Sequence, residues 1–139
     1  MDNNKVFIEK LRSAGLRPTK QRMQICKVLF DRKDTFHFTV TDLIKILEKK
    51  ILKKISVATV YNTVNALKEK AYLKEILIDS EKNYFDTNIS NHHHFYNEST
   101  KELIDLHDND IGKINIKKTL PGKKVKSIEV LVKLDSDNS

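Results

Sequence analysis

Three consecutive histidines, His92, His93 and His94, are the residues of this chain best suited to bind a metal ion. Imidazole nitrogens bind zinc, iron, manganese with oxygen partners, and haem iron. On a strand, alternate side chains share a face, so His92 and His94 would point one way and His93 the other. The run predicts a metal or haem site and leaves open which one. The alternative is a structural or pH-sensitive histidine cluster.

Two further side chains are candidates for the same chemistry. His37 lies far from the run in sequence, and Asp86 lies just before it. His107 is isolated, and we expect it on the surface. Cys26 is the single cysteine, which excludes both an internal disulfide and a structural zinc site built from four cysteines. Its apolar neighbours predict a buried structural thiol.

No pattern indicates catalysis, so we predict that the chain is not an enzyme. It has no Gly-rich phosphate loop, no nucleophile elbow and no His-Glu-x-x-His. A metal-dependent hydrolase is the remote alternative, since it would need three ligands and a general base that Asp86 and the histidines supply in principle.

Residues 55–71 carry a second functional pattern. Apolar side chains recur there at helical spacing, which predicts a helix. Ser56 is a plausible N-cap of this helix. The face opposite the apolar stripe carries Asn62 with Thr59 beside it, and Tyr61 falls at the stripe's edge. Asn pairs with adenine and Thr contacts the thymine methyl, so this face suits the DNA major groove. An ordinary packed helix is the alternative. The stripe consists of Val57, Val60, Val64, Leu67 and Ala71.

The charge is concentrated in the first half of the chain. Residues 1–75 hold 17 Lys and Arg against 8 Asp and Glu, a net charge of +9, whereas residues 76–139 carry −2. A basic half is expected of a protein that binds the DNA backbone, although a solvated lysine surface looks the same. No run has the length of a membrane span and no signal peptide is recognisable, so we expect a cytoplasmic protein without a membrane partner.

The elements that position these residues form a helix-turn-helix. We expect a short helix ending at Gly15, a helix from Lys20 to about Asp31, and a loop from Asp31 to Phe38 that carries His37. A third helix follows a capping box at Thr39. Arg17, Lys20 and Arg22 gather at the start of the second helix, where phosphates bind well.

A hairpin follows the helix of residues 55–71 and makes the predicted domain a winged helix. Strands at 72–78 and 84–86 flank a turn at 79–83, which carries Lys82 at its tip as a DNA-backbone contact. The DNA-binding residues that these patterns predict are therefore Arg17, Lys20, Thr59, Asn62 and Lys82.

We place the domain boundary in the polar stretch around 87–91, giving a winged helix at 1–87 and a second domain at 88–139. The second domain is predicted to have strands at 94–97 and 102–106, a short helix near 110–119 and a strand at 125–134. Some 50 residues bury too little surface to be stable alone, so we expect a homodimer with a sheet completed across a two-fold axis. The fold class is α+β.

Several motifs in this order resemble the ferric uptake regulator (Fur) superfamily over nearly the whole chain. The histidine run and the helix at 57–62 look most like its iron response regulator (Irr) branch. The motifs are Leu11 to Leu16, Pro18-Thr-Lys-Gln-Arg22, Val57-Ala-Thr-Val-Tyr-Asn62, Tyr84-Phe-Asp86 and His92-His-His94.

The resemblance implies a winged helix joined to an α/β dimerisation domain, and a homodimer that binds an AT-rich inverted-repeat operator. It assigns Tyr61 to a base contact and Arg17 to the minor groove. His37, Asp86 and His94 match three ligands of the family's interdomain site, with Tyr96 at the place of the fourth. It thus implies a transcriptional regulator of iron- or haem-responsive genes with haem at the histidine run, or alternatively a repressor that senses Mn, Fe or Zn.

Overall fold

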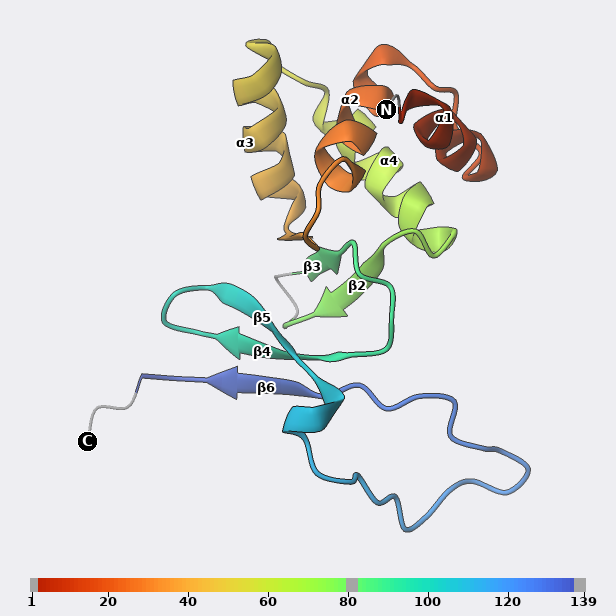
Figure 1. The fold of residues 1–139 in the computed structure, drawn as a ribbon, viewed down its shortest axis with the longest axis vertical. Helices are drawn as coiled ribbons and strands as arrows, with labels where there is room; N and C mark the ends of the chain where they lie inside the picture. The colour runs from red at the N-terminus through yellow and green to blue at the C-terminus, as the bar shows by residue number, and fades with distance from the viewer. Residues whose placement is uncertain (1–2, 80–82, 137–139) are drawn as a thin grey trace. The chain divides into compact units, whose positions relative to one another are not determined.

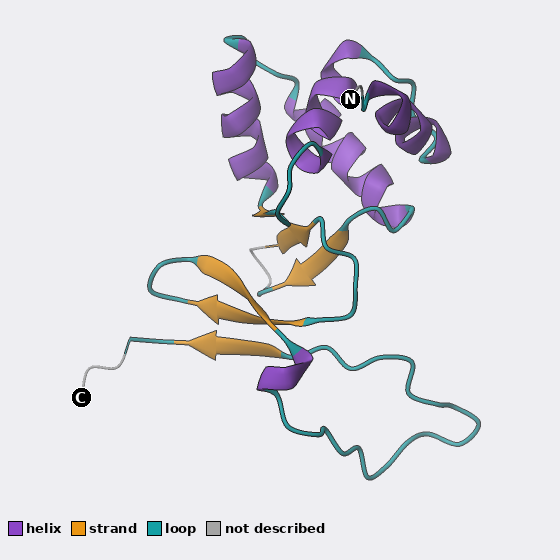
Figure 2. Ribbon diagram, in the orientation of Figure 1, coloured by secondary structure: helices purple, strands orange, loops and turns teal. Residues whose placement is uncertain are grey.

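A computed structural model describes residues 3–79 and 83–136. By its internal contacts the chain divides into two units, Met1–Ile89 and Ser90–Ser139, which are described separately. Figures 1 and 2 show that α1 to α4 all belong to the first unit, and that each unit has a sheet of its own. The elements are α1 (Asn4–Ser13), α2 (Lys20–Phe30), β1 (His37–Phe38), α3 (Val40–Ile51), α4 (Val57–Glu69), β2 (Lys74–Leu77), β3 (Asn83–Asp86), β4 (His93–Asn97), β5 (Glu102–Leu106), the 3₁₀ turn η1 (Asp108–Asp110) and β6 (Leu131–Leu134).

Side-chain caps start three of the four helices in this part of the chain. The Thr19 hydroxyl accepts from the Arg22 amide, and the Ser56 hydroxyl accepts from the Thr59 amide. Thr39 and Asp42 form the predicted capping box, each side chain accepting from the other residue's amide. These bonds satisfy N–H groups that have no partner within the helix, so the helix starts predicted from the sequence are confirmed.

The core of the first unit lies where α2, α3 and α4 meet the sheet. On α4, Val60, Val64 and Leu67 are fully buried, as the predicted stripe requires. Two members of that stripe were assigned wrongly: Val57 is 52% exposed, and Ala71 lies beyond the helix with a positive φ. Val57 sits in the first turn, and the helix enters the core only at Val60.

Strand β3 is the centre of the first sheet, whose order is β1-β3-β2. β2 and β3 form the predicted hairpin, with Leu77 opposite Asn83. β1 was not predicted, because two residues are too short to show a period. It places His37 directly opposite Asp86 rather than in a loop. Lys82 lies outside the described residues.

The second unit is a mixed sheet of order β5-β4-β6. β4 and β5 form an antiparallel hairpin, and β6 returns to pair with β4 in parallel. The Asn97 carboxamide accepts from the amides of Ser99 and Thr100, which fixes the turn between β4 and β5. This turn sets the register across the hairpin, so His94 lies opposite Asp105.

Two predictions for the second unit are wrong. Residues 111–120 are not helical, and the strand expected from residue 125 is regular only over Leu131–Leu134. A helix of about ten residues is marginal without a face to bury, and Gly112 and the β-branched isoleucines disfavour it further. The strand is short because β4 pairs with it only from His94 to Asn97. None of the helices described is long and apolar enough to span a bilayer.

Candidate metal centre and nucleic-acid interface

The first unit contributes an imidazole and a buried carboxylate. The ring of His37 approaches Asp86 across the β1–β3 pair, with Nε2 at 3.0 Å from Oδ2. Asp86 is fully buried, and its other oxygen accepts from the Asn88 amide at 2.8 Å. A carboxylate held in this way has a fixed orientation and one oxygen directed at a histidine nitrogen, as a metal ligand requires.

The second unit contributes two imidazoles and a carboxylate. His92 and His94 lie on one side of β4, with ring centroids 4.4 Å apart. Asp105 on β5 faces both: its Oδ1 is 3.2 Å from Nε2 of His92 and 3.5 Å from Nε2 of His94. Both histidines are buried. Three potential ligand atoms thus converge within this unit alone.

The hydrogen bond at the far side of the His92 ring indicates which protonation form faces Asp105. Nδ1 lies 2.8 Å from the carbonyl oxygen of Ser90, and a carbonyl only accepts, so Nδ1 carries a proton. In the neutral ring Nε2 then carries no proton, and its lone pair faces the Asp105 oxygen. Two acceptors at 3.2 Å repel unless a cation stands between them, either a second proton on the ring or a metal ion. The residues therefore fit a bound metal ion.

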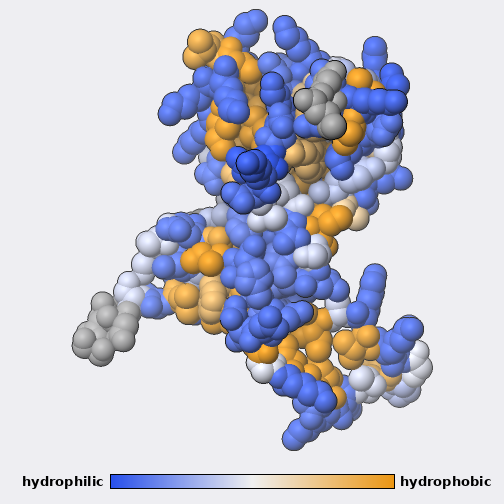
Figure 3. Space-filling view, viewed as in Figure 1, coloured by the Kyte–Doolittle hydropathy of each residue, from blue (hydrophilic) through white to orange (hydrophobic). Residues whose placement is uncertain are grey.

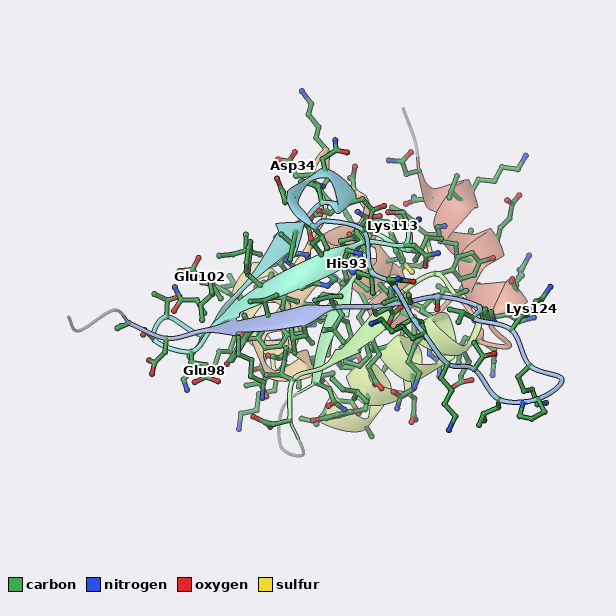
Figure 4. The ribbon with its side chains drawn as sticks, turned by 90° about the horizontal axis from the view of Figure 1, so that it is seen from below. Asp34, His93, Glu98, Glu102, Lys113 and Lys124 are labelled. Carbon is green, nitrogen blue, oxygen red and sulfur yellow. The ribbon has the colours of Figure 1, made fainter. Side chains whose placement is uncertain are left out.

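His93 lies on β4, where Figure 4 labels it, and its contacts lie on the other side of the strand from those of His92 and His94. Its Nε2 is 3.0 Å from Oδ1 of Asp108, and its Nδ1 accepts from the Val130 amide at 2.9 Å. Both ring nitrogens are thus engaged away from His92 and His94. The structure does not bring His93 together with the other candidate ligands. His107 is exposed, as predicted.

Asp105 is the candidate ligand that the sequence reasoning missed. The signal was present, because the predicted strands at 94–97 and 102–106, if paired as a hairpin, place residue 105 opposite residue 94. Together the two units offer five side chains with a nitrogen or oxygen that a metal ion can take: His37, Asp86, His92, His94 and Asp105.

The outer face of α4 offers a polar surface for DNA. Tyr61 is 47% exposed, and Asn62 is exposed too. Thr59 is less accessible, because it is half-buried. Its carbonyl accepts a hydrogen bond from the Thr63 hydroxyl. Thr63 is fully buried and was not predicted to be. Tyr61 and Asn62 are therefore the two side chains of this helix best placed to reach base edges.

A basic surface lies at the start of α2. Arg17 and Lys20 are exposed, and the Arg17 carbonyl accepts from a guanidinium nitrogen of Arg22 at 3.1 Å. Two arginines border a surface hollow of about 480 Å³, which is lined by Arg12, Leu16, Arg17, Pro18 and Thr19. Positive side chains next to a capped helix N-terminus suit a phosphate of the DNA backbone.

Comparison with known proteins decides the family. A profile described as "Ferric uptake regulator family" matches residues 13–134. The chain belongs to the ferric uptake regulator family. It is 34% identical over 100 residues to the peroxide-responsive repressor PerR of Staphylococcus epidermidis, a segment covering 72% of this chain and 65% of that protein. It is 34% identical over 103 residues to the peroxide operon regulator of Bacillus subtilis, covering 74% and 69% respectively.

A solved structure shares the fold. The structure of the ferric uptake regulator from Pseudomonas aeruginosa with manganese matches with a TM-score of 0.67 at 18% identity, covering 96% of this chain and 99% of that one. The predicted α+β fold is confirmed, and the family consists of regulators rather than enzymes. The curated relatives are peroxide regulators, so the predicted iron response branch is not confirmed and haem gains no support.

Proposed function

We propose that this protein is a homodimeric repressor of transcription that binds operator DNA in response to a divalent metal ion. The observation that carries the proposal is the set of imidazoles and carboxylates in the two units. In the first, His37 and Asp86 are paired, and in the second, His92 and His94 face Asp105. Three nitrogens with two carboxylates suit Mn²⁺, Fe²⁺ or Zn²⁺.

The two groups of ligands would serve one ion. Asp86 and His92 are six residues apart, so the chain keeps them within about 20 Å of each other at most. An ion bound by both groups would supply a bridge that restricts how the two units are oriented. Orientation matters because paired recognition helices must reach successive major grooves.

The two units can adopt an arrangement that binds DNA and one that does not. The ion regulates DNA binding only if it binds one of these arrangements more tightly than the other. Coupling of roughly 1–3 kcal/mol is typical and would change operator affinity by about 5- to 150-fold. In this proposal Tyr61 and Asn62 read bases in an AT-rich inverted repeat, while Arg17, Lys20 and Lys82 contact phosphates and sugars.

Dimerisation through the second unit is supported by its small interior. Its buried apolar side chains, among residues 90–136, are Tyr96, Leu103 and Leu106. Two apolar side chains of the sheet in this unit are exposed, Ile104 on β5 and Leu134 on β6. A second copy would cover them, whereas a chain ending at Ile89 should be a monomer in sedimentation.

The proposal is tested by selecting a DNA site from a random pool with the Mn²⁺-loaded protein and then measuring its affinity with and without Mn²⁺. We expect tighter binding with the ion in the wild type and no response in His37→Ala or His92→Ala. Equal affinities with and without Mn²⁺, Fe²⁺ and Zn²⁺ would exclude metal control. A response to haem alone would restore the iron response assignment.

A peroxide response is the second candidate, favoured by the peroxide regulators among the relatives, and the state of the single cysteine indicates which residues would carry it. A thiol sensor needs an accessible thiolate. Cys26 is fully buried, and burial raises the pKa of its thiol to about 12. A peroxide response would therefore pass through the histidine and carboxylate site. Hydrogen peroxide should weaken DNA binding of the Fe²⁺-loaded protein, and Cys26→Ala should respond as the wild type does.

A further inference from the structure

We infer that residues 111–128, here called the lysine arm, form a second contact surface for the phosphate backbone of duplex DNA, outside the winged helix. This inference rests on the proposed DNA-binding function. The arm holds no Asp, Glu or Arg, and its six cations are Lys113, Lys117, Lys118, Lys123, Lys124 and Lys126. They are two thirds of the nine Lys and Arg found in residues 76–139.

The lysines of the arm are free to meet an external anion. All six are exposed, and among the described residues none of their side chains pairs with a carboxylate. Figure 3 shows hydrophilic and hydrophobic side chains beside one another over this part of the chain. A second copy in a dimer would bring six more lysines, and their mutual repulsion favours a polyanion as the partner.

The arm is a closed loop rather than a loose tail. It leaves the sheet after η1 and returns to β6, as Figure 1 shows. The His93 ring joins its two ends, with Nε2 at Asp108 before the arm and Nδ1 at the Val130 amide after it. A turn at Pro121 and Gly122 folds the arm back, with the Lys123 amide donating to the Leu120 carbonyl. Figure 4 labels Lys113 and Lys124, one on each limb.

The type of cation indicates what kind of contact the arm makes. Arg presents a planar fork that binds guanine edges in two-point fashion, whereas Lys is a point charge. An arm with lysines and no arginine therefore suits phosphates better than base edges. The arm is also not helical, so it lacks the amphipathic helix that membrane-surface binding uses. We expect a contact that is independent of DNA sequence and sensitive to salt.

The test measures the affinity of the full-length protein for the selected operator and for unrelated duplex DNA between about 50 and 200 mM NaCl. The variant replaces Lys117, Lys118, Lys123 and Lys124 by Gln. Each phosphate contact contributes about 0.9 to the slope of log affinity against log salt. The homodimer would lose eight contacts, four from each copy, which would lower the slope by about 7.2, so over this salt range the variant should lose about 20,000-fold less affinity than the wild type.

Two control proteins separate a local contact from total charge. One replaces four exposed lysines of the first unit by Gln, removing the same charge: Lys5, Lys27, Lys33 and Lys45. It should keep the wild-type slope. The other replaces the four arm lysines by Arg and should keep the slope too, which excludes misfolding as the cause.

The inference would be overturned if the arm variant kept the wild-type slope, or if the first-unit control flattened it equally. It would also be overturned if the arm variant lost binding to anionic phospholipid vesicles and kept its DNA binding. Failure of the wild type to bind any duplex would instead refute the proposed function, so the two outcomes are distinguishable.

Discussion

Replacing Asp105 by Asn tests the metal centre at the residue that the second unit places between two histidines. Asn has nearly the shape of Asp but no negative charge, and its amide can donate to the lone pair of His92 Nε2, so the apo fold should persist. Groups that only orient a ligand change metal affinity by about 10–100-fold. Asp105 Oδ1 lies 3.2 and 3.5 Å from the two nitrogens and would itself bind the ion.

We therefore expect Asp105→Asn to weaken Mn²⁺ binding by at least about 100-fold, which corresponds to about 2.8 kcal/mol. Isothermal titration of the apo-protein with Mn²⁺ measures the loss directly. Half-maximal operator binding should then require a proportionally higher Mn²⁺ concentration, because ion and DNA binding are linked.

A matched control makes the same chemical change on the other side of β4. Asp108 faces His93 at 3.0 Å, a contact of the same kind, but it does not meet His92 or His94. Asp108→Asn should change Mn²⁺ affinity by less than about tenfold. Equal Mn²⁺ affinity of Asp105→Asn and wild type would refute the ligand assignment, as would an equal loss in both variants.

Replacing Tyr61 or Asn62 by Ala should remove about 1–3 kcal/mol of preference for the selected operator over unrelated DNA in binding titrations, and unchanged selectivity would contradict the role of α4. His93→Ala should speed hydrogen exchange of the Val130 amide, which loses its acceptor, while Mn²⁺ affinity stays close to that of the wild type. If instead Mn²⁺ binding is lost, His93 belongs to the metal centre. Cys26 should react with iodoacetamide only in denaturant at neutral pH, because its raised pKa leaves almost no thiolate; rapid labelling of the native protein would disprove its burial.

The sequence predicted those features of the fold and of the candidate site that depend on residues close together in the chain. Capping residues act within three positions along the chain, so Thr19, Thr39 and Ser56 marked the starts of three helices. Strand alternation likewise separates His92 and His94 from His93, as the structure has it.

Residues far apart in sequence were decided by tertiary structure. His37 meets Asp86 because a two-residue strand pairs with β3, and a segment so short has no period to reveal it. The sequence also favoured a helix and a long strand after residue 110. Neither forms to that extent, because the helix has no face to bury and β4 offers only four partners to β6. Local patterns thus determined which residues could bind a metal ion, and strand pairing decided which of them face one another.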